Sequence, residues 1–358
     1  MIGYFIKKIG YALLTLVGVV TVIFLLFNVL PGDPARMMLD QKEDPEQLAK
    51  IRKKYGFDKP VLTQYAYYIN DLSPLSLHHT SPDSYTYLTP NKYKAIPIVT
   101  IAKSTLVIKK PYLRESFQKT GKRVSEVIAE TLPNTVVLAV SAITIAIVLG
   151  ILLGIISAQV KDSWLDKAIQ IISTLGMSVP SFFSAILFAW LFGYVLHEFT
   201  GLRMTGSLYA LDDFGERLTI QWKNLILPAL VLGIRPLAVV IQLMRNSLLE
   251  VYNQEYIRTA KAKGLSTYQI IKRHALKNAL NPVITAISGW FASMLAGAVF
   301  VEYIFGWNGL GKEIVDALNT LDLPVIMGAV LIIASLFILI NILVDVIYSW
   351  LDPKIRLS

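Results

Sequence analysis

Few residues of this chain have the types and spacing that metal binding or catalysis requires. The chain has no cysteine, which excludes disulfides and thiolate metal sites. Its four histidines lie at positions 78, 79, 197 and 274, without the spacing of a zinc-binding helix. The adjacent His78 and His79 could hold a metal weakly, but we interpret them as an exposed polar pair. We therefore expect no metal site and no cofactor.

One stretch imitates a nucleotide site. The residues "GWNGLGKE", 306–313, match the G-x-x-x-x-G-K pattern of a phosphate-binding loop. Glu313 stands where that loop needs serine or threonine to hold magnesium, and no buried strand precedes it. The sequence also has no G-x-S-x-G nucleophile elbow and no pair of aspartates within its apolar segments. This pattern predicts a protein that is not itself an enzyme.

The composition is typical of a membrane protein. Of 358 residues, 54% are hydrophobic and only 16% are charged, which is too apolar for an ordinary soluble domain. A helix needs about 20 mostly apolar residues to cross a bilayer. Six segments meet this requirement, at 9–30, 133–158, 168–195, 225–244, 280–304 and 325–351. We predict an all-α, polytopic membrane protein with six transmembrane helices and a large extracytoplasmic loop between the first two.

The distribution of positive charge predicts the orientation of the chain. Lys7 and Lys8 precede the first apolar segment, which is too long for a signal peptide and lacks a small-residue cleavage site. We interpret it as a retained helix with a cytoplasmic N-terminus. Residues 244–279 carry seven Lys and Arg against two acidic residues, which places this loop and the C-terminus in the cytoplasm. The long segment 31–132 then lies outside.

The outer segment combines one predicted helix with an irregular stretch. In "EDPEQLAKIRKKYGF", Asp44 is placed to cap a helix that Pro45 begins and Gly56 ends. From 73 to 111 the composition shifts to Pro, Ser, Thr and Tyr, which predicts loops or short strands. Eight of the 17 tyrosines lie between residues 31 and 132. They could anchor the segment at the membrane interface or form a surface that receives a partner.

Small residues at intervals of four mark faces where helices can pack closely. Gly150 and Gly154 share one face of the second apolar segment, so we assign them to helix packing. The fifth segment has two such ridges, Ser288, Ala292 and Ala296 on one and Gly289, Ser293 and Gly297 on the other. A helix with two small-residue faces suits a central position or the wall of a narrow path.

Prolines and one arginine interrupt the apolar segments. Pro180, Pro228 and Pro236 remove backbone hydrogen bonds and therefore predict kinks. Arg235 lies near the middle of the fourth segment, where a charge costs at least about 2.5 kcal/mol even on lenient insertion scales. It could pair with an acidic residue, line an aqueous cavity, or meet a substrate carboxylate, and the sequence leaves these interpretations open.

A strongly basic segment, "YIRTAKAKGLSTYQIIKRHALKNALNP" at 256–282, lies between two apolar segments. Gly264 can supply the left-handed residue that ends one short helix. Ser266 and Gln269 have the spacing of a capping box for a second helix. The pattern therefore predicts a helix, a tight turn and another helix.

The second of these helices has an apolar stripe formed by Leu265, Tyr268, Ile271 and Ala275. An exposed stripe on a cytoplasmic loop favours docking into a protein groove. A passive charge anchor would need the lysines but not the glycine and the cap. Nucleic-acid binding is disfavoured because both ends of the segment are tethered to the bilayer.

This basic segment closely resembles the cytoplasmic coupling loop of binding-protein-dependent ABC importer permeases of the dipeptide, oligopeptide and nickel class. The general form of that loop has Glu-Ala-Ala beginning six residues before its glycine, where this sequence has Arg258, Thr259 and Ala260 before Gly264. Other blocks resemble the class in its order: "LPGDPA", "YGFDKPVLTQYAYY", "TLPNTVVLA", "SVPSFF", "ILPALVLG", "VEYIFGWNGLG" and "VDVIYSWLDPKIR". The resemblance covers nearly the whole chain.

The resemblance implies the ABC type I importer permease fold and a division of the chain. The implied parts are a cytoplasmic N-terminus and first helix (1–30), an extracytoplasmic loop (31–130), an ABC transmembrane core (131–347) with a coupling loop at about 250–279, and a cytoplasmic tail (348–358). Residues of about 73–111 look like an insertion. Gln242 and Asn308 stand where the family often has arginine and proline, which weakens any transfer of substrate preference.

The function implied by the resemblance is a permease subunit that moves short peptides across the cytoplasmic (inner) membrane by alternating access. Its partners would be a homologous second permease, two cytoplasmic ABC ATPase subunits that hydrolyse ATP, and an extracytoplasmic solute-binding protein. Nickel or another small solute is an alternative cargo. An ATPase-independent secondary transporter or channel is an alternative of a different class.

The resemblance and the sequence pattern together select the candidate site residues. The ATPase-coupling residues are Arg258, Thr259, Ala260, Lys261, Gly264, Leu265, Tyr268, Ile271 and His274. The translocation path would include Arg235, Ser288, Ala292 and Ala296.

Overall fold

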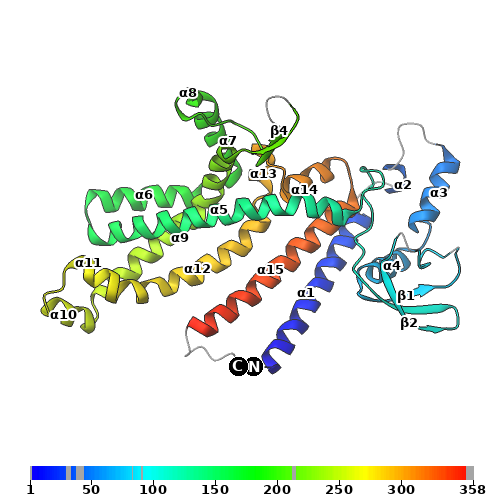
Figure 1. The fold of residues 1–358 in the computed structure, drawn as a ribbon, viewed down its shortest axis with the longest axis horizontal. Coiled ribbons are helices and arrows are strands. Elements are labelled where there is room, and N and C mark those ends of the chain that lie inside the picture. Colours follow the sequence, from blue (N-terminus) through cyan, green and yellow to red (C-terminus); the bar gives the residue numbers. More distant parts are fainter. Residues whose placement is uncertain are drawn as a thin grey trace. The chain divides into compact units, whose positions relative to one another are not determined.

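The structure, a computed structural model, describes residues 2–29, 34–37, 44–82, 84–89, 92–211 and 215–351. The chain forms two compact units (Figure 1). The first comprises Met1–Glu130, Ile314–Ser335 and Ser358, and the second comprises Thr131–Glu313 and Leu336–Leu357. Most of the predicted tail at 348–358 and of the "LPGDPA" block lies outside the described residues.

Four helices of the described chain are long and apolar enough to cross a membrane. They are α1 (Ile2–Val29), α5 (Val124–Gln159), α9 (Trp222–Tyr252) and α15 (Leu323–Leu351). Two further spans are bent: α6 (Trp164–Ser178) with the segment Ser181–Val195, at 110°, and Thr267–Leu295 with α13 (Val299–Phe305), at 56°. Counting each bent pair as one span gives up to six, and the predicted multi-pass helical fold is confirmed. Among the described residues, short strands occur only in the segments between these spans.

The 110° bend has a local cause at Pro180. Val179 and Pro180 both adopt extended conformations, with ψ of 133° and 139°, between α6 and α7 (Ser181–Trp190). Proline donates no backbone hydrogen bond and disfavours helical geometry in the residue before it. One helix therefore ends and another begins, as predicted. In contrast, α9 continues through Pro228 and Pro236.

The first unit contains short helices and a small sheet. After α2 (Pro34–Met37), α3 (Pro45–Tyr55) and α4 (Val61–Leu72) come β1 (Leu75–His79), β2 (Ala95–Ile101) and β3 (Ser104–Lys109). The strands are antiparallel in the order β1-β3-β2, so the predicted short strands are present. Asp44 caps α3 by accepting the Glu46 N–H at 3.0 Å, and Gly56 ends it at φ 73°, as predicted.

Several tyrosines of this unit surround a buried carboxylate, which neither predicted role had anticipated. Asp71 is only 1% exposed and accepts hydrogen bonds from the hydroxyls of Tyr85 at 3.0 Å and Tyr93 at 2.7 Å. The Arg114 guanidinium donates to the same carboxylate through Nε at 3.0 Å. Because a buried charge is stable only when it is paired and hydrogen-bonded, these groups are part of the unit's interior.

The prediction that His78 is exposed is wrong. Its ring lies edge-on to Tyr93 at 4.5 Å between centroids and hydrogen-bonds to the Ser76 hydroxyl and the Thr86 carbonyl. Alternate residues of β1 face inward, so Ser76 and His78 are both buried. His79 faces the other side and is half-buried.

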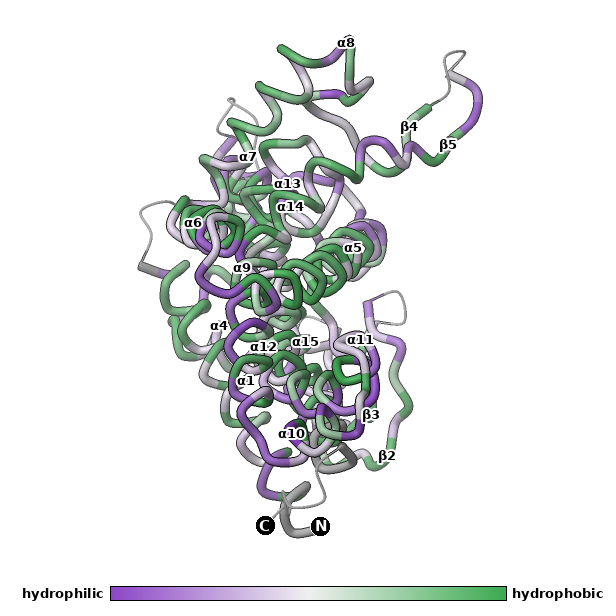
Figure 2. Tube along the Cα trace, turned by 90° about the vertical axis from the view of Figure 1, so that its left-hand side faces the viewer, coloured by the Kyte–Doolittle hydropathy of each residue, from purple (hydrophilic) through white to green (hydrophobic). Residues whose placement is uncertain are grey.

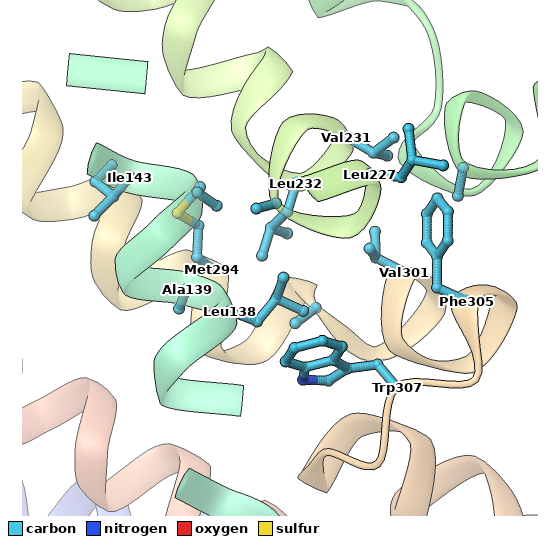
Figure 3. Packing of buried hydrophobic residues seen from close by; sticks show 14 of the residues in the cluster. Leu138, Ala139, Ile143, Leu227, Val231, Leu232, Met294, Val301, Phe305 and Trp307 are labelled. Atoms are coloured by element: carbon cyan, nitrogen blue, oxygen red, sulfur yellow. The ribbon is translucent and has the colours of Figure 1, made fainter. Parts of the chain in front are cut away.

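The second unit has a core to which α5, α7, α9, α12 (Leu276–Gly297) and α13 all contribute, and Figure 3 shows part of it. Leu138, Ala139 and Ile143 come from α5, and Leu227, Val231 and Leu232 from α9. Met294 of α12, Val301 and Phe305 of α13, and Trp307 also belong to it. The unit also includes η1, a π-helix (Leu191–Val195), α8 (His197–Thr200) and an antiparallel hairpin of β4 (Tyr209–Leu211) and β5 (Leu218–Ile220).

Two glycines of α5 lie directly against α9. A Cβ on Gly150 would lie 2.6 Å from Val240 Cγ1, and one on Gly154 would lie 2.6 Å from Met244 Cβ and 2.9 Å from the Ile241 carbonyl oxygen. These distances leave no room for a methyl group. The absence of side chains at both positions is therefore what lets the two helices approach so closely.

Replacing Gly154 by alanine should therefore destabilise the second unit by about 1–3 kcal/mol, the usual cost of overpacking. Gly289 in α12 is the matched control, because no atom lies within 4 Å of its Cβ position. Gly289→Ala should leave stability unchanged or raise it slightly. Unfolding in mixed detergent micelles would compare the variants, and equal stability of the two would contradict the assigned packing.

Candidate functional site

The basic segment forms the predicted helix, turn and helix. Helix α10 spans Glu255–Ala262, and Gly264 follows at φ 77°. Ser266 then caps α11 (Thr267–Ile270) through a complete capping box with Gln269. A π-helix, η2 (Ile271–Ala275), joins α11 to α12. The turn is thus fixed by one left-handed residue and one cap.

The apolar side of this segment packs against the chain's own helices, so the prediction of a fully exposed stripe is wrong. Ile271 and Ala275 are buried, and Leu265 is half-buried. Ala275 and Leu265 belong to a cluster with Ile257 and Ala260 of α10. The cluster also contains residues of α9 and α12, including Met244, Leu248, Ala279 and Val283. The segment is therefore attached firmly to both neighbouring spans rather than suspended between them.

The opposite side of the segment is polar and exposed. Figure 2 shows mainly hydrophilic residues around α10. Tyr268 is 69% exposed, with the Lys272 ammonium 5.6 Å from its ring centroid. Of the other predicted coupling residues, His274 is half-buried and Ala260 is buried. Arg258, Thr259, Lys261 and Gly264 are exposed. This outer side, which we call the coupling surface, presents cations and the ring of Tyr268.

A largely buried ion pair joins the helices next to this surface. It was not predicted from the sequence. Arg245, near the end of α9, donates to the Asp166 carboxylate of α6 from Nε at 2.8 Å and from a terminal nitrogen at 2.6 Å. The Ser157 hydroxyl of α5 donates to the same carboxylate at 2.5 Å, and the Asp162 N–H at 2.9 Å. The Asp166 side chain is 3% exposed and that of Arg245 is 17% exposed. This Asp166–Arg245 clamp joins α5, α6 and α9.

Arg235 lies in a small polar pocket of the second unit. The pocket has a volume of about 100 Å³, and its lining includes Ser181, Ser184, Trp290 and Ser293. The Arg235 guanidinium makes no hydrogen bond or ion pair with another residue in the described part of the chain. No acidic side chain of the described residues pairs with this charge, so hydration or an external anion is the favoured interpretation.

The other predicted path residues do not line the Arg235 pocket. Ser288 is half-buried, and its hydroxyl donates to the Ile284 carbonyl at 2.9 Å. Ala292 is 1% exposed, and the side chain of Ala296 lies outside the described residues. Ser293, from the second small-residue ridge, does line the pocket. The two ridges of α12 thus face different surroundings.

A second buried group, around Glu302, fixes the turn between α13 and α14 (Leu310–Asn319). Glu302 Oε2 accepts the N–H of Gly311 at 2.7 Å and of Lys312 at 3.1 Å. The indole of Trp307 donates to the Asn134 carbonyl at 3.0 Å. Sterics account for the second glycine of the phosphate-loop pattern, because a Cβ on Gly311 would lie 2.6 Å from Val299 Cα and 2.9 Å from Glu302 Oε2.

Comparison with known protein families assigns this chain to one of them. Residues 150–357 match the family described as "Binding-protein-dependent transport system inner membrane component", and residues 1–78 match its N-terminal component. The chain belongs to this family. The permease is thus a multi-pass membrane subunit of a binding-protein-dependent transport system, as the sequence resemblance implied.

Full-length relatives agree with this assignment. The permease is 31% identical to the dipeptide transport system permease protein DppB of Alkalihalophilus pseudofirmus, over 99% of this chain and 100% of the relative. It is 32% identical to the di/tripeptide transport system permease protein DppB of Pseudomonas aeruginosa, over 99% of both chains. Among solved structures, an inward-facing MetNI methionine ABC transporter matches with a TM-score of 0.50 and 15% identity, covering 63% of this chain and 97% of that one. That match supports the ABC importer permease fold alone.

Proposed function

We propose that this permease moves short peptides across the cytoplasmic membrane as one half of an ATP-driven channel. The names of its full-length relatives support dipeptides or tripeptides as the cargo class. The proposed partners are a homologous second permease, two cytoplasmic ATPase subunits and an extracytoplasmic binding protein. ATP hydrolysis belongs to the ATPase subunits.

The observation that carries the proposal is the coupling surface and its attachment. Gly264 and the cap at Ser266 fix its shape, and the cluster around Ile257 seats it on α9 and α12. Because the coupling surface is rigidly joined to two spans, a movement of an attached ATPase would be transmitted to those spans. Alternating access to the two sides of the membrane then follows from movement of the spans around Arg235.

The decisive experiment asks whether transport depends on ATPase partners. The tagged chain, purified from its own membranes, should bring down a second permease and ATPase polypeptides identified by mass spectrometry. Uptake of a labelled dipeptide should stop when the ATPase is inactivated. Uptake that continues without ATP would support the secondary transporter or channel instead, and uptake of nickel but not of dipeptide would change the cargo.

Gly264 offers a direct test of the coupling surface. Valine at this position must adopt a left-handed backbone, which costs an L-residue about 1–2 kcal/mol. Since no atom lies within 4 Å of the Cβ position, the loss would come from the backbone and not from a clash. Gly264→Val should lower ATP-driven uptake, whereas Gly264→Asn, which tolerates this conformation, should retain most of it. Equal uptake by both variants would contradict the role of the turn.

Arg235 is proposed to meet the carboxylate of the cargo during passage. Arg235→Gln should then slow uptake of dipeptides with a free carboxyl group by about tenfold, the worth of one hydrogen bond to a charged group. The same peptides with an amidated carboxyl should be affected much less. If both kinds of peptide slow equally in the variant, the guanidinium serves folding or hydration instead.

A further inference from the structure

The first unit contains a pocket that the transport function does not use. Its volume is about 260 Å³, just below the range of about 300–1,000 Å³ typical of small-molecule sites. The lining residues, which we call the Lys92 pocket, are Tyr55, Tyr85, Thr89, Lys92, Tyr112, Arg114 and Glu115. The size suits a ligand no larger than an amino acid or a short peptide.

Most charged groups around this pocket already have partners. Asp71, behind the tyrosines, is neutralised by Arg114, whose guanidinium also lies 5.0 Å from the Tyr68 ring centroid. The Lys109 ammonium donates to the carbonyl oxygens of Asp71 and Ser73. Among the charged residues that line the pocket, these contacts leave Lys92 and Glu115.

Those two charges are Lys92 and Glu115. Neither the Lys92 ammonium nor the Glu115 carboxylate makes a hydrogen bond or an ion pair with another described residue. The Lys92 ammonium lies 4.0 Å from the Tyr85 ring centroid, 4.8 Å from that of Tyr93 and 5.5 Å from that of Tyr112. The tyrosine rings thus position the ammonium but provide no acceptor for its three N–H groups.

The backbone conformation of Arg114 is a second observation that points to a binding site here. Its φ is 69°, a left-handed conformation that is uncommon for any residue other than glycine. Such conformations persist only where the surroundings hold them, and they gather at binding sites. Here the contact with Asp71 holds Arg114, and the adjacent Glu115 is thereby fixed beside the pocket.

We infer that the Lys92 pocket binds the zwitterion of a free amino acid or short peptide, with Lys92 receiving the carboxylate and Glu115 the ammonium. A cation and an anion that line one pocket without pairing complement a ligand that carries both charges. The tyrosine rings provide apolar walls for the ligand's carbon atoms. This inference does not depend on the proposed transport function, because the pocket and Arg235 belong to different units.

The pH dependence of binding follows from Lys92. Burial lowers the pKa of its ammonium from 10.5 to about 8, although Asp71 and Glu115 oppose the shift and Arg114 and Lys109 add to it. Burial raises the pKa of Tyr85, Tyr93 and Tyr112, so these phenols stay protonated in the same range. The α-amino group of a free dipeptide also loses its proton near pH 8, so the N-acetylated dipeptide, whose carboxylate does not titrate in this range, isolates the effect of Lys92. Its affinity should fall as pH rises from about 7 to 9, because Lys92 loses its proton.

The test uses the full chain in lipid nanodiscs and L-alanyl-L-alanine as the probe. Cyanate modifies the neutral Lys92 amine at pH 8, and mass spectrometry follows the rate at that residue. The dipeptide should protect Lys92 in a saturable manner and should not protect Lys103, an exposed lysine outside the pocket. No protection of Lys92 at any soluble concentration would overturn the inference.

Paired changes in ligand and protein assign the two charges. Glu115→Gln should weaken binding of the dipeptide at least about tenfold, since a hydrogen bond to a charged group is worth one decade of affinity or more. N-acetylation of the dipeptide should cause the same loss in the unaltered chain and no further loss in Glu115→Gln. Lys92→Met, followed by saturation-transfer NMR, should match the effect of amidating the carboxyl group.

Two results would count against this assignment. Acetylated or amidated dipeptide that binds the unaltered chain as tightly as the free dipeptide would overturn it without any variant. Full binding by both Glu115→Gln and Lys92→Met would overturn it as well. Because the ligand analogues test the unaltered chain, misfolding of either variant does not remove the test.

Discussion

Asp166→Asn should destabilise the second unit by about 3 kcal/mol and abolish most transport. The change removes the negative charge that Arg245 contacts through two hydrogen bonds, while the arginine stays largely buried. Breaking a buried ion pair on one side costs about 3–5 kcal/mol, and the partial exposure of Arg245 favours the lower value. Unfolding in mixed micelles and ATP-driven uptake per folded molecule would measure the two effects.

Asp162→Asn is the matched control for this change. Its side chain is 78% exposed, and the hydrogen bond from its backbone N–H to Asp166 survives the substitution. Stability should change by no more than about 0.5 kcal/mol. Adding Arg245→Gln to Asp166→Asn should cost less than the sum of the single changes, because the two side chains act as one pair. Additive losses would contradict the clamp.

Trp307→Ala should have a comparable or larger effect, about 3–5 kcal/mol, because it removes a fully buried indole from the core of the second unit. The same change deprives the Asn134 carbonyl of its indole donor. Trp307→Phe should recover most of the packing but leave this carbonyl unsatisfied, at a cost of about 1–3 kcal/mol. Both costs would appear in equilibrium unfolding of the full chain.

Trp164 provides the comparison for Trp307. It belongs to the same unit but is 79% exposed, so Trp164→Ala removes few contacts within the chain. The unfolding free energy of Trp164→Ala should therefore lie closer to that of the unaltered chain than the unfolding free energy of either Trp307 variant does. If Trp164→Ala is as unstable as Trp307→Ala, the core drawn in Figure 3 does not carry the stability of this unit.

Features set by neighbouring residues could be predicted from the sequence. The cap at Asp44, the end of α3 at Gly56, the break at Pro180 and the turn at Gly264 all depend on residues within a few positions. A proline without an N–H, or a glycine at positive φ, acts in the same way in most surroundings. The approximate positions of the membrane spans followed from apolar length for the same reason.

Features that join distant residues could not be predicted. Asp166 and Arg245 are separated by 79 positions, and Arg245 was counted only as a topological charge. Asp71 and Arg114 are separated by 43 positions, and their contact buries tyrosines that composition alone had assigned to a surface. Such pairs depend on how the helices pack, and a single sequence does not contain that information. A polar residue just after a helix cap, as Asp166 follows Ser163, was the one local signal available.

The π-helix η2 explains why the predicted apolar stripe was only partly correct. A π turn holds one residue more than an α turn, so it rotates everything after it by about 100° relative to a continuous α-helix. Tyr268, before η2, faces outward, whereas Ile271 and Ala275, within it, face the chain's own spans. This single wide turn therefore sets the rotation of α12 about its axis, and with it which of the two ridges lines the pocket of Arg235; it is the ridge that contains Ser293. The rotation of the whole fifth span about its axis is thus determined at its N-terminal end, next to the coupling surface.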